Sequence, residues 1–140
     1  MLRGDTGLKR CNALITGGAG FIGSHLVDKL MNKQWNLVVF DNLSSGDLKN
    51  IHKWLKNKRL RFINGDLKSI DAVEKAVRDV ELVFHFAANP EVRVGETDPS
   101  VHFEENLMAT FNLLEAMRIS KKAKTLMLAL HCMQCMHAKG

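Results

Sequence analysis

Short apolar runs alternate with longer amphipathic stretches along nearly the whole chain. Each run is too short for an ordinary helix, and four of the five are apolar at almost every position, as strands buried on both faces of a sheet are. The remaining run, residues 60–63, is the third along the chain and is amphipathic. The predicted strands are 12–16, 37–40, 60–63, 81–87 and 125–130.

The stretches between these strands predict helices with a period of 3.6 residues. Residues 21–32 form the first helix, and Ile22, Leu26 and Leu30 share one face that we expect to be buried. A basic and polar helix is predicted for residues 46–56.

Two further helices carry start signals. Ser69 is a predicted N-cap, and Asp98 is a cap that precedes a proline at the first helical position. The apolar residues that we expect these helices to bury are Ile70, Val73 and Val77 in the first, and Phe103, Leu107, Phe111 and Leu114 in the second.

The alternation of strands and helices predicts the fold class. Strands that are apolar on both faces imply a parallel sheet covered by helices on both sides, and right-handed crossovers make such an α/β sheet doubly wound. We therefore expect one Rossmann-like domain over residues 1–140, with strand order 3-2-1-4-5 and a sheet truncated after the fifth strand. A sheet of this kind binds its ligand at the carboxyl ends of the strands.

The strongest local signal joins the first strand to the first helix, in residues 16–25. Gly17, Gly20 and Gly23 fit the spacing G-x-x-G-x-x-G, and Gly18, Gly20 and Gly23 fit G-x-G-x-x-G. Glycine at these positions allows a tight turn, close approach of a pyrophosphate to the backbone, and tight packing of the helix on the sheet. The N–H groups at the helix N-terminus can then bind phosphate.

Acidic residues follow the second and third strands. Asp41 can accept both hydroxyls of an adenosine ribose, which favours NAD over NADP. The alternative interpretation is an Asp-Asn turn after a strand. Asp66 can accept the adenine amino group, with Leu67 against the base, or it can cap a helix. His85, near the end of the fourth strand, is interpreted as a core histidine rather than a catalyst.

Composition narrows the classes of function. The chain has 140 residues and no tyrosine, so a mechanism that needs a tyrosine acid or base cannot run on these residues alone. The net charge of +5 favours weak attraction to phosphates.

No apolar run reaches the roughly 18 residues of a membrane span, and we expect a cytoplasmic protein with no membrane partner. The basic run 52–61 is interpreted as a solvated surface, so no nucleic acid is predicted as a partner.

These segments together resemble the extended short-chain dehydrogenase/reductase family, and within it the NAD-dependent nucleotide-sugar epimerases and dehydratases. The segments that carry the resemblance are 16–26, 41–46, 65–67, 85–88 and 106–110. Residues 88–93 are most similar to the UDP-hexose 4-epimerases of archaeal type.

The resemblance implies roles in binding NAD for residues at four strand ends and on one helix. By this resemblance the pyrophosphate would be held by Gly17, Gly20, Phe21, Ile22 and Gly23, and the adenosine ribose by Asp41, Asn42, Ser44 and Ser45. The adenine would be held by Asp66 and Leu67. The nicotinamide end would be held by Phe86, Ala87, Ala88 and Asn106. Pro90 and Glu105 stand where some relatives place a lysine and an asparagine. The resemblance also implies a UDP-hexose substrate for the full-length form and a homodimer formed through the helix around 103–117.

In the family, catalysis begins after the fifth strand, where a serine or threonine and then a Tyr-x-x-x-Lys pair act on the sugar. Residues 126–140 contain no serine, threonine or tyrosine. We therefore predict no catalytic residue in this chain, and we expect it to be an incomplete NAD-binding domain without turnover.

Residues 126–140 are rich in methionine, cysteine and histidine. We interpret them as a non-native or frameshifted tail, with a frayed terminus as the plainest alternative. A zinc site made by His131, Cys132, Cys135 and His137 is a further alternative, but the ligands crowd together and we predict no metal site. The three cysteines are interpreted as reduced thiols.

Overall fold

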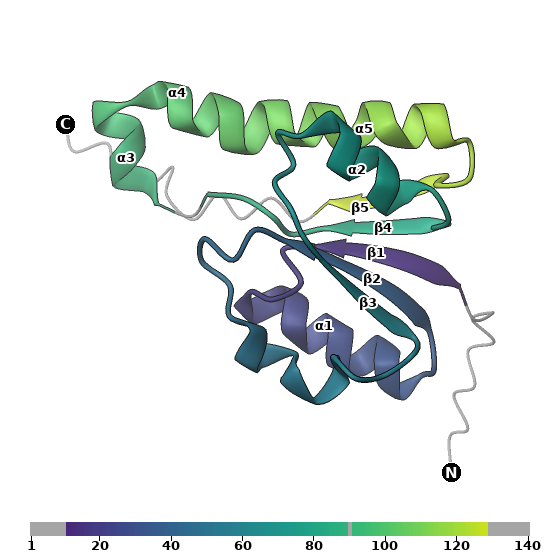
Figure 1. The fold of residues 1–140 in the computed structure, drawn as a ribbon. Coiled ribbons are helices and arrows are strands. Elements are labelled where there is room, and N and C mark those ends of the chain that lie inside the picture. Colours follow the sequence, from purple (N-terminus) through teal and green to yellow (C-terminus); the bar gives the residue numbers. More distant parts are fainter. Residues whose placement is uncertain (1–10, 90, 129–140) are drawn as a thin grey trace, which may run out of the picture.

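The computed structural model describes residues 11–89 and 91–128. Its strands form one parallel sheet in the order β3-β2-β1-β4-β5, which confirms the predicted fold class and strand order (Figure 1). The strands are β1 (Asn12–Thr16), β2 (Asn36–Asp41), β3 (Leu60–Asn64), β4 (Leu82–His85) and β5 (Thr125–Leu128). Thr16 lies in register with Phe40 of β2 and with His85 of β4, so three strands end side by side.

The described helical elements follow the predicted pattern in part. The helices are α1 (Phe21–Asn32), α2 (Ile70–Val77), α3 (Val92–Thr97), α4 (Pro99–His102) and α5 (Ala109–Ser120). Short 3₁₀ turns η1 (Leu48–Asn50) and η2 (His52–Trp54) follow β2, and a π-helical turn η3 (Phe103–Met108) joins α4 to α5. The predicted helix over 46–56 is absent, α3 is a helix that the sequence did not predict, and the helix predicted after Asp98 is divided into α4, η3 and α5.

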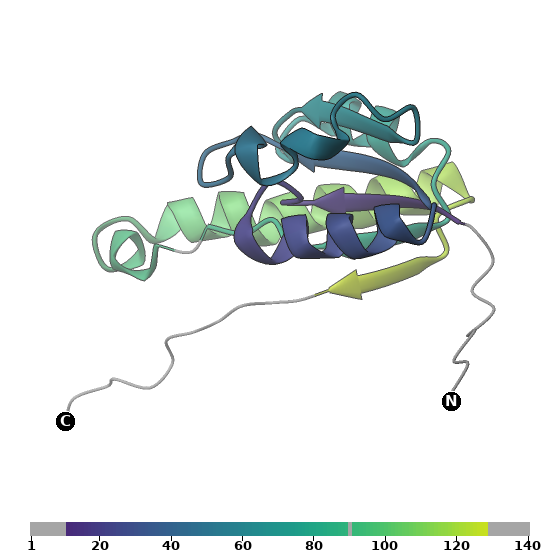
Figure 2. The ribbon, with the colours of Figure 1, turned by 90° about the horizontal axis from the view of Figure 1, so that it is seen from below.

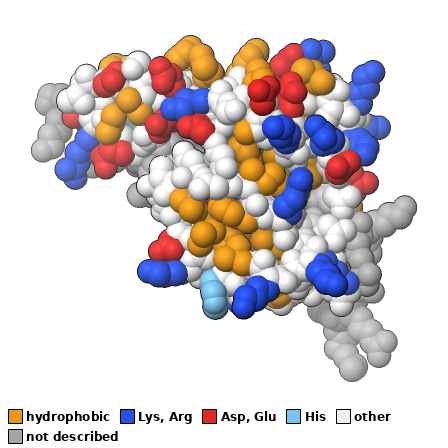
Figure 3. Space-filling model, in the orientation of Figure 1, with side chains coloured by type: hydrophobic (Ala, Val, Ile, Leu, Met, Phe, Trp, Pro, Cys, Tyr) orange, Lys and Arg blue, Asp and Glu red, His pale blue; other side chains and the backbone are white. Residues whose placement is uncertain are grey.

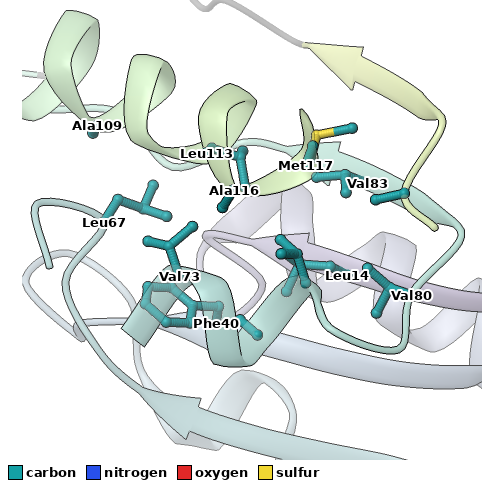
Figure 4. Close-up of a cluster of buried hydrophobic side chains, with 13 residues drawn as sticks. Leu14, Phe40, Leu67, Val73, Val80, Val83, Ala109, Leu113, Ala116 and Met117 are labelled. Atoms are coloured by element: carbon teal, nitrogen blue, oxygen red, sulfur yellow. The ribbon is translucent and has the colours of Figure 1, made fainter. Parts of the chain in front are cut away.

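Helices cover both faces of the sheet (Figures 1 and 2). A hydrophobic core lies between the sheet and the helices on each face. The first packs α2 and α5 against the sheet, with Leu14, Val83 and Leu113 fully buried (Figure 4). The second packs α1 and the turns η1 and η2 against the other face, around Ile15 and Ile51. Loops from both helix layers therefore meet at the carboxyl ends of the central strands.

The predicted buried face of the last helix is wrong. Leu107 and Phe111 are 60% and 62% exposed, and Phe103 and Leu114 are also exposed, whereas Ala109, Asn112, Leu113, Ala116 and Met117 face the sheet. In α1 and α2 the predicted face is confirmed except at its first residue: Leu30, Val73 and Val77 are buried and Leu26 is half-buried, whereas Ile22 and Ile70 are exposed. The 3.6-residue spacing of apolar residues locates a helix. When both faces of the helix carry apolar side chains, this spacing does not show which face packs against the sheet.

The predicted helix over 46–56 is replaced by η1 and η2. Asp47 accepts a hydrogen bond from the Lys49 N–H at 2.9 Å, and Ile51 turns fully inward to the core. The ring N–H of Trp54 donates to Asp28 on α1 at 2.6 Å. These three anchors hold the segment against α1 in a tighter path than a continuous α-helix allows.

The two predicted caps have different outcomes. Asp98 accepts a hydrogen bond from the Ser100 N–H at 3.1 Å, with Pro99 at the first helical position, as predicted. Ser69 occupies the N-cap position of α2, but its side chain makes no capping hydrogen bond. Residues 129–140, with the alternative zinc ligands, lie outside the described residues, and 126–128 form the end of β5.

Candidate functional site

A cleft lies where the carboxyl ends of β1, β2, β3 and β4 meet the π-helical turn η3. It brings together residues that are far apart in the sequence, and most of the predicted cofactor-binding residues are among them. The lining residues are Gly17, Gly20, Phe40, Asp41, Asn42, Ser44, Ser45, Gly65, Asp66, Leu67, Phe86, Ala87, Ala88, Asn89, Glu105 and Ala109.

Four of the predicted residues, Phe21, Ile22, Gly23 and Asn106, do not line the cleft. The side chain of Phe21 is 81% exposed and lies beside His25 on the first turn of α1. Ile22 is also exposed, whereas Gly23 is buried under the glycine loop. The lining that sequence reasoning missed consists of Phe40, Gly65, Asn89, Glu105 and Ala109.

The glycine loop is held by close backbone contacts. Gly17 has φ of +67°, and a Cβ there would lie 2.7 Å from the Ala87 nitrogen. The Gly17 N–H donates to the Phe40 carbonyl at 2.9 Å. A Cβ at Gly23 would overlap the Gly17 carbonyl oxygen, so α1 can begin directly beneath the loop only with glycine at this position. The spacing of the glycines therefore serves both the turn and the packing of the helix.

The N-terminus of α1 is open toward the loop. Its N-cap is Gly20, no side chain caps it, and no acidic residue stands in the first turn. The first-turn N–H groups of a helix have no acceptor within that helix and carry partial positive charge. This end of α1 can therefore accept an anion.

Asp41 is buried and ties the glycine loop to the end of β2. One carboxylate oxygen accepts from the Ala19 N–H at 2.9 Å, and the other accepts from the Leu43 N–H at 2.9 Å. The residue thus makes the local turn that the alternative interpretation expected, and it also lines the cleft. Each carboxylate oxygen has a second lone pair with which to accept a hydrogen bond from a ligand.

Ala19 is a junction that the sequence did not reveal. Its carbonyl accepts from the Asn50 side-chain N–H at 2.8 Å and from the Asp47 N–H at 3.1 Å. Together with Asp41 on its N–H, these bonds join the glycine loop to the segment 42–50. Ser44 and Ser45 of that segment line the cleft, so their position depends on Ala19.

The β3 side of the cleft is a turn at Asp66 and Leu67. Asp66 accepts from the Lys68 N–H at 2.8 Å, and its other oxygen lies 3.7 Å from the Lys68 ammonium. The buried side chain of Asn112 on α5 donates to the Leu67 carbonyl at 3.0 Å. This turn is therefore held by α5, which packs beside α2 on the same face of the sheet, through a polar residue within an apolar helix face.

The β4 side of the cleft depends on Asn89 and Asn106. The Asn106 carboxamide oxygen accepts from the Asn89 N–H at 2.8 Å, and the Asn89 carboxamide donates to Glu105 at 2.7 Å. Asn106 therefore supports the wall from behind, while Glu105 and Asn89 form its surface.

His85 lies beneath this wall, with 2% of its surface exposed. Burial lowers the pKa of His85 to about 4, so the ring is neutral near pH 7. Its two ring nitrogens lie within hydrogen-bond distance of Thr16 and Thr110. The sequence interpretation of a core histidine agrees with this placement.

The fold and the glycine loop together resemble the dinucleotide-binding class of α/β proteins. The NAD dependent epimerase/dehydratase family matches residues 13–133. The UDP-glucose 4-epimerase of Bacillus subtilis (strain 168) is 41% identical over 108 residues, which are 74% of this chain and 32% of the relative.

Solved structures agree with the sequence match. The UDP-glucose 4-epimerase of Thermus thermophilus, in complex with NAD, is 40% identical with a TM-score of 0.71, over 81% of this chain and 36% of that one. A double mutant of the dTDP-glucose 4,6-dehydratase DesIV of Streptomyces venezuelae, with NAD and DAU bound, is 31% identical with a TM-score of 0.75, over 81% and 37%.

The chain therefore belongs to the NAD dependent epimerase/dehydratase family, which confirms the family resemblance. It spans about a third of the length of these relatives. Within residues 11–89 and 91–128, no helix is long and apolar enough to cross a membrane, and no cluster of histidine, cysteine and acidic residues could hold a metal ion.

Proposed function

We propose that this chain binds NAD in the cleft, as the cofactor-binding part of a UDP-hexose 4-epimerase. The observation that carries the proposal is the glycine loop, where Gly17 lies against Ala87 and α1 begins without a capping side chain. A pyrophosphate can approach this backbone closely because no Cβ stands in the way.

The rest of the lining fits the other parts of the cofactor. Asp41 offers oxygen lone pairs to ribose hydroxyls, and its negative charge opposes a 2′-phosphate, so we expect NAD to be preferred over NADP. Asp66 and Leu67 offer an acceptor and an apolar contact for the adenine. The small residues Ala87 and Ala88 leave room for the nicotinamide end. Phe21, Ile22, Gly23 and Asn106 would act through backbone N–H groups or as supports, because their side chains do not line the cleft.

When bound, NAD supplies the hydride acceptor for a transient oxidation at C4 of the sugar. The residues of this chain would bind and orient it and exclude water from its inner edge. No tyrosine occurs among the 140 residues, so we propose that they bind NAD without turning over UDP-glucose. The UDP-hexose would be a substrate of the longer form.

A second candidate is an NAD-dependent nucleotide-sugar dehydratase, favoured by the likeness to the DesIV enzyme. Incubation of residues 1–140 with NAD and UDP-glucose tests the proposed lack of turnover, because an epimerase releases UDP-galactose and a dehydratase releases a 4-keto-6-deoxy sugar. We expect neither product from residues 1–140, and an NAD-binding module without catalysis would behave in the same way. Release of UDP-galactose would overturn the proposal that these residues lack turnover.

A second copy of the chain is the proposed partner of the exposed apolar stripe on η3 and α5. The stripe consists of the exposed residues Phe103, Leu107, Phe111 and Leu114. Groups of hydrophobic side chains lie along the upper edge of the molecule, where α5 runs in Figure 1 (Figure 3). Sedimentation measurements on wild type and Phe111→Glu test the homodimer. We expect the variant to shift toward monomer, and a wild type that stays monomeric at high concentration would contradict the dimer. We also propose a cytoplasmic location, as the sequence predicts.

Calorimetric titration with NAD tests the binding proposal. Gly20→Val places a β-branched side chain in the cleft, at a position whose only close neighbour is the Gly17 carbonyl, 3.2 Å from a Cβ. We expect wild type to bind and this variant to lose measurable affinity, while Lys56→Val, with the same new side chain on an exposed turn, binds like wild type. A folded wild type that gives no NAD signal would overturn the proposal.

A further inference from the structure

His85 is a buried polar residue that the proposed function does not use. It stands at the end of β4, directly beside Thr16 at the end of β1. Its Nδ1 lies 2.6 Å from the Thr16 hydroxyl oxygen, and its Nε2 lies 3.0 Å from the Thr110 hydroxyl oxygen on α5. The ring therefore bridges the strand beneath the glycine loop and the helix that follows η3.

The hydrogen bonds around the ring determine which nitrogen carries the proton. The Thr110 hydroxyl donates to the Asn106 carbonyl at 2.6 Å, so toward His85 it can only accept. Nε2 must then carry the hydrogen, and Nδ1 must accept from the Thr16 hydroxyl. The Thr16 oxygen remains able to accept the Ala87 N–H, which lies at 3.3 Å. One neutral tautomer satisfies every contact, and the lowered pKa of the buried ring agrees with it.

This path continues from Thr110 to the surface of the cleft. Asn106, whose carbonyl accepts the Thr110 hydroxyl, uses its side-chain oxygen to hold the Asn89 N–H at 2.8 Å. Asn89 lines the cleft on the β4 side, and Ala87 lines it directly beside Gly17. The chain of hydrogen bonds thus connects the two walls of the cleft through Thr16, His85, Thr110 and Asn106.

The path also acts on the π-helical turn η3. A π-helical turn is less favourable than a regular α-helical one and is usually maintained by specific contacts. The Thr110 hydroxyl, bonded to both the Asn106 carbonyl and His85, supplies such a contact at the C-terminal end of η3. Without it, η3 can relax toward α-helical geometry, which would rotate Asn106 relative to Asn89.

We propose that His85 is a positioning residue that, as the Nε2–H tautomer, sets the spacing between the glycine loop and the η3 wall of the cleft. It acts through Thr16 and Thr110 and does not itself line the cleft. The effect on cofactor affinity rests on the proposed function, whereas the tautomer and the position of Asn89 do not.

The first test is long-range ¹H–¹⁵N NMR of the 140-residue chain at pH 7. We expect His85 to show a protonated Nε2 and an unprotonated Nδ1. A protonated Nδ1, or a ring charged at this pH, would overturn the proposal whether or not the chain binds NAD.

The second test removes the Thr110 hydroxyl and restores it. Thr110→Val should speed hydrogen exchange of the Asn89 amide and weaken NAD binding by about tenfold, the effect of losing one buried hydrogen bond. Thr110→Ser keeps the hydroxyl and should return both readouts to near wild type. The matched control is Thr97→Val, because the Thr97 hydroxyl also donates to a backbone carbonyl, that of Val94 at 3.2 Å, but lies outside this path.

The outcomes separate the two proposals. If wild type does not bind NAD, the proposed function fails, and the Asn89 exchange rate still tests the positioning role. If Thr110→Val changes the Asn89 exchange rate and the NAD affinity no more than Thr97→Val does, His85 does not position the η3 wall and the inference fails. His85→Leu combined with Thr110→Val should lose less than the sum of the two single variants, since both changes break the same contact between His85 and Thr110. Additive losses would contradict this.

Discussion

The two walls of the cleft are built in different ways. The wall at the ends of β1 and β2 is held mainly by close backbone contacts of the glycine loop, and the Asp41 carboxylate accepts hydrogen bonds from the Ala19 and Leu43 N–H groups. The wall formed by β4 and η3 depends on side-chain hydrogen bonds, which join His85 to Thr110, Asn106 to the Asn89 N–H, and Asn89 to Glu105. A backbone-built wall depends on a few residue types at fixed spacing, whereas a side-chain-built wall tolerates more sequences and leaves no short motif.

The largest expected effect tests the backbone-built wall. Gly23→Ala should destabilise the fold by more than about 4 kcal/mol, because its Cβ would overlap the Gly17 carbonyl and neither backbone can move without breaking the loop. Urea unfolding measures this cost. The matched control is Gly20→Ala, whose Cβ meets only the Gly17 carbonyl at 3.2 Å and should cost about 1 kcal/mol or less. Equal costs would mean that the glycine loop is not held by close packing.

The next effect concerns the helix that carries the other wall. Leu113→Ala should cost about 3 to 4 kcal/mol, because Leu113 is fully buried against the sheet. Leu114→Ala, one residue further on the exposed face, should cost less than about 1 kcal/mol. Thermal or urea unfolding of the pair checks which face of α5 is buried. A larger cost at Leu114 would restore the face that periodicity predicted.

The third effect is a pH dependence of stability that comes from His85, beneath the wall formed by β4 and η3. The pKa of His85 is lowered to about 4 in the fold, whereas an unfolded histidine keeps a pKa of 6.5. Below pH 6.5 His85 binds a proton in the unfolded chain but stays neutral in the folded chain. The free energy of unfolding should therefore fall as the pH drops from 6.5 to 4. The loss attributable to His85 is at most about 3 kcal/mol. His85→Gln, which does not titrate, should show a flatter stability profile over this window, and parallel profiles would contradict the assignment.

The same contrast explains what the sequence could predict. Gly17, Gly20, Asp41 and Asp66 belong to a motif whose chemistry requires those residue types, and all line the cleft. Phe40 lines it without any local signal, and Asn89 and Glu105 lie in segments that the family resemblance covers without predicting a place for them in the site; the positions of all three follow from packing and from η3. The π-helical turn could not be predicted from apolar period.

The phase of the last helix shows a second limit. Leu107, Phe111 and Leu114 form as good an apolar stripe as the buried one, and the sequence treats them alike. What decides between the faces is the small Ala109 and Ala116 with the polar Asn112, which allow close approach to α2 and the Leu67 turn. A pattern that counts hydrophobicity alone ranks these residues below the exposed leucines and phenylalanines.

The smallest expected effect lies in the turn after β2, on the backbone-built wall. Leu43 adopts φ of +59°, a left-handed conformation that costs a residue with a side chain about 1 to 2 kcal/mol. The Asp41 carboxylate holds it there through the Leu43 N–H. Leu43→Gly removes that cost but loses more chain entropy on folding, by about 0.5 to 1 kcal/mol. We therefore expect a net stabilisation of about 0.5 kcal/mol by urea unfolding, with NAD affinity unchanged or improved. Leu43→Ala is the control, because it shortens the side chain but keeps the strained backbone. If both variants change stability equally, the side chain rather than the backbone conformation of Leu43 determines the effect, and this turn is then not under the strain that its φ implies.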